Sequence, residues 1–364
     1  AQAILAQGTR PRRSSLAVVL PMPGPAHVAV LGGGALGCLW AARLARAGVG
    51  TSLLLRGRPE GPRQTLRLEN AWERSDKART EHVEVCVEAA DATGGSLDYV
   101  LVATKVHAAT AGLTAIAPRL GPRAVAIVLC NGSLALQEEL EQERALGGLT
   151  ILLGTTTHGA WRRAPFDVCH AGFGQTWFGL RRQGGRSVEP PDSAGAFLEL
   201  LSRSGLCGSG SSCTDIEPHL WQKLAINAAI NPLTALWECR NGDMLSRSDG
   251  IRTLQAVASE VAAVATAMGV SAEDGTQFEA DRLCHLIEAC ARDTAANYSS
   301  MCQDVMARRR TEIEYLNGWI ARRGPELGVP VPTNAQLADA VRQKERELMP
   351  PVTCRDSGNK KKNE

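Results

Sequence analysis

The chain has 364 residues, of which 44% are apolar and 21% are charged, and its formal net charge is +2. This length exceeds what one hydrophobic core usually supports, so we expect two domains in an ordinary globular protein. The small net charge argues against a general nucleic-acid-binding protein. No apolar run approaches the roughly 18 residues that a membrane-spanning helix needs. We therefore expect neither a nucleic acid nor a membrane as a partner.

The 11 cysteines are scattered from Cys38 to Cys354 and form no C-x-x-C pair. A disulfide framework or a zinc site would need cysteines in groups of suitable spacing. We therefore predict free thiols, no bound metal and a reducing, cytoplasmic location.

Both ends of the chain differ in composition from the middle. Residues 1–26 contain Arg10, Arg12 and Arg13 but no acidic residue. This composition is typical of an organelle transit peptide and equally of a flexible extension. We predict such a segment at residues 1–25, with a mitochondrial or plastid location as the alternative. Residues 351–364 are polar and lysine-rich, and we predict a disordered tail there.

In chain order, the first elements predict a strand–helix–strand unit. Residues 27–31 are a short apolar run that ends at glycines, residues 38–45 have helical periodicity, and residues 51–55 form a second apolar run. This order is typical of the βαβ unit of a doubly wound sheet. Further strands are predicted at 99–104, 124–130, 149–154 and 167–178. Helices are predicted at 109–120 and at 194–204, the latter after a Gly/Pro/Ser-rich loop at 184–193.

After about residue 216 the pattern changes to long helical stretches without strands. These stretches are 218–239, 251–268, 280–296, 299–323 and 336–348. The sequence therefore predicts an α/β Rossmann-type dinucleotide-binding domain over residues 26–214, followed by an all-α domain over residues 215–350.

The glycine-rich turn after the first strand has the G-x-G-x-x-G spacing of dinucleotide-binding loops. Its residues are Gly32, Gly33, Gly34, Ala35, Leu36 and Gly37. In such a loop Gly32 permits the tight turn, Gly34 lets a pyrophosphate approach the backbone, and Gly37 lets helix and strand pack closely. A tight turn without a ligand is the alternative.

The residue after the second strand indicates which dinucleotide binds. Sites for NAD place a carboxylate there, whereas this chain has Arg56. A guanidinium pairs with the 2′-phosphate of NADP(H), so the sequence favours NADP(H).

Two stretches of the second half carry polar residues at helical spacing. Lys223, Asn227 and Asn231 fall on one face of a predicted helix. Such a lysine either reaches bulk water or projects into a polar cavity, and the two amides favour a cavity. A second stripe, about 120° wide, runs along the predicted helix at 299–323 and the residue pair before it. Its members are Asn297, Ser300, Asp304, Arg308 and Glu312.

Several motifs, in this order, resemble those of the ketopantoate reductases (2-dehydropantoate 2-reductases), NADPH-dependent enzymes of pantothenate synthesis. The resemblance runs from about Val28 to about Leu348. The motifs are the glycine loop, Asn131-Gly132, Gly154-Thr155-Thr156-Thr157-His158, Leu220-Trp221-Gln222-Lys223-Leu224, Asn231-Pro232-Leu233-Thr234-Ala235, Asn241-Gly242 and Thr311-Glu312-Ile313.

The resemblance implies a role for each matching residue. Lys223 matches the general acid that protonates the reduced carbonyl oxygen. Glu312 matches the residue that holds the terminal hydroxyl of the substrate, and Ser300 and Asn297 match positions at its carboxylate end. Asn227 and Asn231 line the same pocket, and Asn131 lies near the nicotinamide and the carbonyl. Lys105 and Arg56 match contacts of the cofactor phosphates. Asp304 fits the family pattern as a residue that helps to hold the pocket. We interpret His158 as structural rather than as a catalytic base.

Two alternatives keep the fold but change the function. One is an NADPH-dependent reductase of another branched or hydroxylated 2-oxo acid, because a fold does not define a substrate. The other is a catalytically silent NADPH-binding regulator. The joint presence of Lys223, Asn131, Ser300 and Glu312 argues against it. We expect a monomer or a homodimer.

Overall fold

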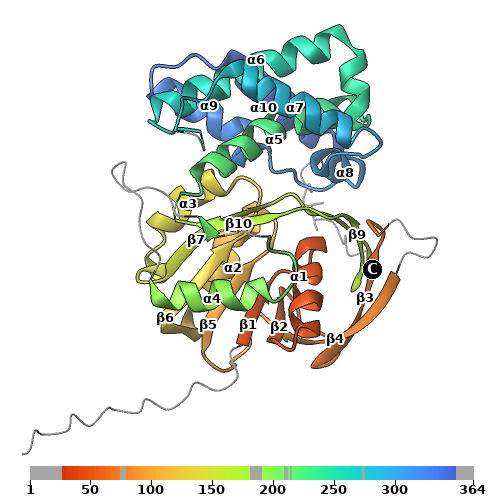
Figure 1. Cartoon of the computed structure of the whole chain (residues 1–364), viewed down its shortest axis with the longest axis vertical. Helices are drawn as coiled ribbons and strands as arrows, with labels where there is room; N and C mark the ends of the chain where they lie inside the picture. The colour runs from red at the N-terminus through yellow and green to blue at the C-terminus, as the bar shows by residue number, and fades with distance from the viewer. Residues whose placement is uncertain are drawn as a thin grey trace, which may run out of the picture.

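The computed structural model describes residues 27–73, 79–180, 191–208, 212–213, 215–272 and 275–349. The predicted extension at 1–25, the predicted tail at 351–364 and most of the predicted loop at 184–193 lie outside these ranges. The described chain forms a sheet-containing half, at the bottom of Figure 1, and a helical half, at the top. This arrangement confirms the predicted fold class.

The sheet has 11 strands within the described residues, in the order β11-β10-β7-β6-β5-β1-β2-β4-β3-β9-β8. Neighbouring strands from β7 to β4 run parallel, as in a doubly wound sheet. The strands are β1 His27–Leu31, β2 Gly50–Leu55, β3 Arg63–Asn70, β4 Arg79–Ala89, β5 Leu97–Val102, β6 Leu120–Val128, β7 Thr150–Thr156, β8 Gly159–Ala164, β9 Asp167–Gly172, β10 Thr176–Gly179 and β11 Ser212–Cys213.

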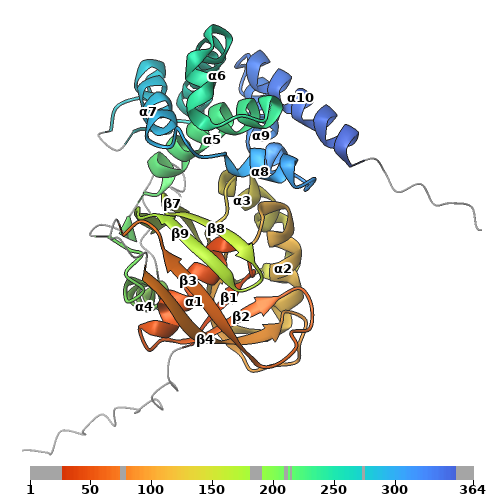
Figure 2. The same cartoon turned by 90° about the vertical axis from the view of Figure 1, so that its right-hand side faces the viewer.

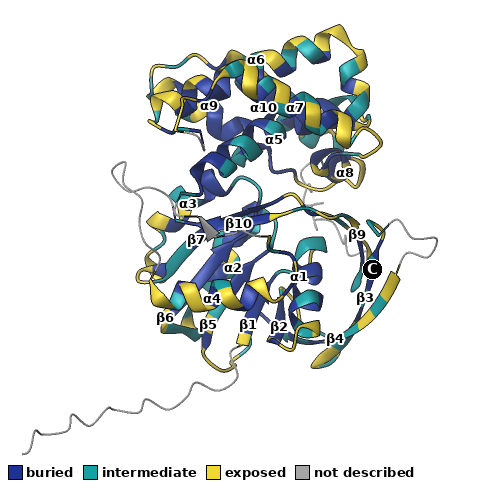
Figure 3. Ribbon diagram, viewed as in Figure 1, coloured by how far each residue is buried: buried dark blue, intermediate teal, exposed yellow. Residues whose placement is uncertain are grey.

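Helices cover both faces of this sheet. On one face, α1 (Ala35–Arg46) and α4 (Asp192–Ser202) pack on the central strands through Trp40 and Phe197. On the other face lie α2 (Ala109–Ile116) and α3 (Ser133–Gln142). Covered on both sides, the central strands are buried almost throughout, as the dark ribbon in Figure 3 shows.

Beyond β2 the sheet curls around α1. Strand β3 pairs antiparallel with β4, β9 runs parallel to β3, and β8 returns antiparallel to β9. Helix α1 contacts all four of these strands, and Figure 2 shows them alongside it. Strands β3, β4 and β8 are not predicted from the sequence, and the single strand predicted at 167–178 is two strands, β9 and β10. The curl brings a late segment of the chain next to the glycine loop.

The helical half contains α5 Glu217–Trp237, α6 Ser248–Ala267, α7 Ala280–Asp293, α8 Ser300–Met306, α9 Asn317–Glu326 and α10 Pro332–Leu348. The prediction of one helix over 299–323 is wrong, because α8 ends at Met306 and α9 begins at Asn317. Arg308 has a φ of 50°, and its N–H donates to the carbonyl of Val305 while that of Arg309 donates to the carbonyl of Asp304. These bonds form a Schellman motif, which ends a helix. An arginine occupies the position where glycine is usual.

The two halves share one apolar core. A continuous cluster of buried side chains joins Val102 and Val128 of the sheet to Trp221 of α5 and Trp319 of α9. None of the helices in the described ranges is long and apolar enough to cross a membrane.

Candidate active site

The glycine loop has the backbone geometry that its sequence predicts at two positions. Gly32 has a φ of +114°, and a Cβ atom on Gly37 would lie 1.9 Å from the carbonyl oxygen of Gly32. Only glycine therefore fits either position without a shift of the backbone. Gly34 is the N-cap residue of α1, no side chain caps this helix, and its first turn holds no acidic residue. The uncapped N-terminus of α1 is suited to binding a phosphate.

Arg56 lies just after the second strand of the βαβ unit, as the sequence pattern predicts. It is exposed and directly follows Leu55, the last residue of β2. Within the described residues it forms no hydrogen bond or ion pair, so its guanidinium is available to a ligand.

A cleft of about 610 Å³ lies between the two halves of the chain. Leu36 of the glycine loop and the segment from Thr155 to Trp161 contribute to its wall from the sheet side. The cleft is also lined by six of the residues predicted from the sequence: Asn131, Lys223, Asn227, Asn231, Asn297 and Ser300. The fold thus gathers most of the predicted substrate residues in one place, next to the glycine loop.

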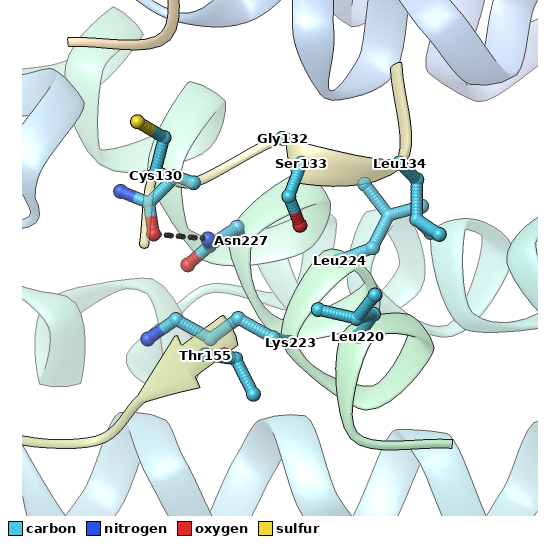
Figure 4. A pocket seen from close by; sticks show the side chains of 10 residues that line it. Cys130, Gly132, Ser133, Leu134, Thr155, Leu220, Lys223, Leu224 and Asn227 are labelled. Atoms are coloured by element: carbon cyan, nitrogen blue, oxygen red, sulfur yellow. Dashed lines mark hydrogen bonds between the residues drawn. The ribbon is translucent and has the colours of Figure 1, made fainter. Parts of the chain in front are cut away.

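Helix α5 presents Lys223, Asn227 and Asn231 to this cleft. Figure 4 shows the Lys223 side chain extending on the same side of α5 as the Asn227 amide. Burial lowers the pKa of Lys223, and the nearby Cys290 and Glu312 oppose this effect only in part. Within the described chain, no hydrogen bond or ion pair holds the ammonium. The Nδ2 atom of Asn231 is buried and also lacks a partner there.

A chain of amide hydrogen bonds fixes the orientation of Asn131, which follows β6. Its Oδ1 accepts from Nδ2 of Asn227 at 3.3 Å, drawn dashed in Figure 4, and its Nδ2 donates to Oε2 of Glu312 at 3.1 Å. Glu312 also accepts from the backbone N–H of Val106 at 3.3 Å. A carboxylate accepts hydrogen bonds and does not donate them, so the NH2 group of Asn131 must face Glu312 and its oxygen must face Asn227.

Lys105 and Glu312 lie behind Asn131 and are not among the residues that line the cleft. The Nζ atom of Lys105 lies 2.5 Å from Oδ2 of Asp304 and 3.9 Å from Oε2 of Glu312. The predicted single stripe of polar residues is also wrong, because the break after α8 turns Glu312 back toward the sheet. Asn297 and Ser300 remain at the cleft, since they lie before this break.

His158 lines the cleft but uses both ring nitrogens within the fold. Its Nδ1 accepts from the N–H of Gly174 at 3.0 Å and lies 3.1 Å from Nε2 of His170. Its Nε2 then carries the hydrogen that binds the Leu206 carbonyl at 3.0 Å. This arrangement supports a structural role for His158.

Three residues at the cleft or at the glycine loop are not predicted from the sequence. Cys290 of α7 and Tyr298 line the cleft near the predicted set. Arg162 of β8 lies at the glycine loop. Neither α7 nor β8 carries a motif of its own, so only the tertiary structure reveals these neighbours.

Known proteins of one family match almost the whole described chain. The family model described as ketopantoate reductase PanE/ApbA matches residues 28–183, and its C-terminal counterpart matches residues 215–345. A 2-dehydropantoate 2-reductase from Vibrio cholerae is 32% identical over 322 residues, which cover 88% of this chain and 98% of that protein. The enzyme of that name from Shigella flexneri is 34% identical, over 88% of this chain and 95% of its own.

Solved structures show the same likeness in three dimensions. A PanE/ApbA family ketopantoate reductase from Ralstonia eutropha JMP134 superposes with a TM-score of 0.74 at 27% identity, covering 88% of this chain and 99% of that one. A D-mandelate dehydrogenase, solved with NADH and anilino(oxo)acetate, has the same fold with a TM-score of 0.73 at 21% identity. Its coverage is likewise 88% of this chain and 99% of its own. With both family models matched and relatives aligned over nearly their full length, this chain belongs to the ketopantoate reductase family.

Proposed function

We propose that the protein is an NADPH-dependent 2-dehydropantoate 2-reductase, which reduces the 2-oxo group of ketopantoate to the hydroxyl of pantoate. The observation that carries this proposal is the position of Lys223. Its ammonium lies in the interdomain cleft, without a partner in the described chain, beside a set of amides and next to the glycine loop. The curated relatives of this name support the same activity.

The residues at the sheet side fit a phosphorylated dinucleotide. The uncapped N-terminus of α1 would hold the diphosphate, and Arg56 would hold the 2′-phosphate that distinguishes NADPH from NADH. When bound, NADPH supplies the hydride that reduces the 2-oxo carbon.

Lys223 acts as the general acid in this proposal. Negative charge develops on the carbonyl oxygen during the reduction, and an ammonium beside that oxygen stabilises the charge and donates a proton. Because its pKa is lowered, Lys223 is a stronger acid than an exposed lysine and donates its proton more readily near neutral pH.

The amides and hydroxyls of the cleft orient the substrate. Asn297 and Ser300 are exposed to the cleft and would bind the carboxylate, and the unpaired Nδ2 of Asn231 offers a further donor. Glu312 stands one hydrogen bond behind Asn131. A substrate hydroxyl that replaces the Asn131 amide at Oε2 would bind this carboxylate directly.

The test is oxidation of NADPH by the purified protein with a panel of 2-oxo acids. We expect the highest kcat/KM with ketopantoate, and a much lower value with 3-methyl-2-oxobutanoate, which has the branched chain but no terminal hydroxyl. A preference for 3-methyl-2-oxobutanoate or for an aromatic 2-oxo acid would support the alternative reductase. Binding of NADPH without turnover of any member of the panel would support the silent regulator.

A further inference from the structure

Strand β8 brings a cation to the glycine loop from a segment much later in the chain. The Nη1 atom of Arg162 donates a hydrogen bond to the carbonyl oxygen of Gly33 at 2.7 Å. Arg162 and Gly33 are 129 residues apart in sequence. The contact exists because the sheet curls around α1 and ends in the β8–β9 hairpin.

The pairing of β8 with β9 determines which way Arg162 points. Arg162 lies opposite Val168, and directly opposed residues of an antiparallel pair share a face of the sheet. Val168 is fully buried in the cluster that contains α1, so Arg162 also faces α1. The next residue, Arg163, instead binds Glu69 at 2.8 Å and lies 3.6 Å from Asp167.

The charges at this place are unbalanced in the described structure. The N-terminus of a helix carries a partial positive charge, and α1 has neither a side-chain cap nor an acidic residue in its first turn. Arg162 adds a full positive charge beside it and forms no ion pair with any described carboxylate. An anion bound between the two would therefore be attracted by both.

The guanidinium of Arg162 is already held at the loop. A guanidinium has five N–H donors, and the bond to Gly33 engages only one nitrogen of Arg162. The remaining donors can bind two phosphate oxygens side by side, a geometry that arginine favours. The ordering of this long side chain is thus partly complete before a ligand arrives.

We infer that Arg162 is a dinucleotide-binding residue that contacts the diphosphate from the side opposite the N-terminus of α1. The inference rests on the proposed function, because it needs a dinucleotide in the glycine loop. It gives the two arginines different tasks: Arg56 recognises the 2′-phosphate, whereas Arg162 binds the diphosphate that NADPH and NADH share.

The experiment measures dissociation constants by calorimetric titration of the full chain with NADPH, NADH, ADP-ribose and adenosine 2′-monophosphate. Arg162→Ala should weaken binding of the three diphosphate compounds by about tenfold each, the usual effect of one charge-assisted contact. It should leave adenosine 2′-monophosphate, which has no diphosphate, unchanged. Arg162→Lys should recover part of the loss.

The control is Arg163→Ala, which changes the neighbouring arginine on the same hairpin and should leave all four dissociation constants unchanged. Equal binding by wild type and Arg162→Ala would overturn the inference while leaving the proposed function intact. Equal losses for adenosine 2′-monophosphate, or equal losses in Arg163→Ala, would assign Arg162 a structural role and also overturn it. A wild-type protein that binds none of the dinucleotides would instead refute the proposed function.

Discussion

The ammonium of Lys105 lies 2.5 Å from Oδ2 of Asp304, and this ion pair joins the segment just after β5 to helix α8 across 199 residues of sequence. Asp304 is only 2% exposed and also accepts from Nε of Arg309 at 3.1 Å. Together with the bond between Asn131 and Glu312, the pair connects the two halves of the protein immediately behind the cleft.

Substitution of Asp304 by Asn should lower the free energy of unfolding by about 1–2 kcal/mol. The expected cost is below that of a fully buried pair because Lys105 is 40% exposed. Denaturant titration measures the change. The matched control is Glu199→Gln, since Glu199 pairs with Arg203 on the open surface. A change no larger in Asp304→Asn than in the control would contradict the structural importance of the pair.

Substitution of Lys223 by Met should separate activity from stability. Because burial lowers the pKa of Lys223, the folded state disfavours its proton, and the penalty applies at every pH below the ordinary value of 10.5. Removing the charge should therefore raise the melting temperature. Turnover should fall at least about a hundredfold with the general acid gone. Lys344→Met, at a half-buried lysine that pairs with Glu238 and does not line the cleft, should leave turnover unchanged. Turnover near the wild-type level in Lys223→Met would reject the proposed acid.

Substitution of Arg56 by Ala should raise KM for NADPH by about tenfold and leave KM for NADH unchanged, because only NADPH carries the 2′-phosphate. Initial rates with both cofactors give the comparison. Arg58→Ala is measured in the same way for comparison, because Arg58 is also exposed just after β2. Equal losses with both cofactors in Arg56→Ala would undo the argument for NADPH.

The buried pair of His158 and His170 should make stability sensitive to acid. Burial lowers the pKa of His170 to about 4, so the folded state keeps this ring neutral. The neutral ring costs no stability above the unfolded-state pKa of about 6.5. As the pH falls from 6.5 toward 4, the unfolded state binds a proton that the folded state does not, so the free energy of unfolding decreases by up to about 1.4 kcal/mol per pH unit. Melting temperatures measured between pH 7 and pH 4 follow the effect. His170→Gln, which keeps a donor but does not titrate, should flatten this dependence; an unchanged slope would assign the sensitivity to other groups.

The parts of the fold that the sequence predicts are those with local causes. The unit around the glycine loop follows from two apolar runs and three glycines within 30 residues. The face of α5 that carries Lys223 follows from helical spacing alone. These patterns need no knowledge of distant segments, and the structure contains both.

The missed parts depend on distant segments. Strands β3 and β4 alternate between buried and exposed residues and carry charges such as Glu84 on the exposed side, so they lack the continuous apolar run of a central strand. Their buried residues pack on α1, and β3 pairs with β9, where Asp167 lies 100 residues after its partner Arg67. The end of α8 carries no glycine or proline, only a run of arginines, so its left-handed residue at Arg308 has no local signal.

The curl of the sheet around α1 delays some contacts until late in the synthesis of the chain. The glycine loop is synthesised before its later partners, because Arg162 follows 129 residues after Gly33, and Asp304 follows 199 residues after Lys105. Long-range contacts of this kind form only after the intervening chain is available to close the loop. A nascent chain that has reached β6 therefore holds the glycine turn without its cation from β8 or the helical wall of the cleft. On the proposed function, a nucleotide would therefore bind to the completed chain and not to its early fragments.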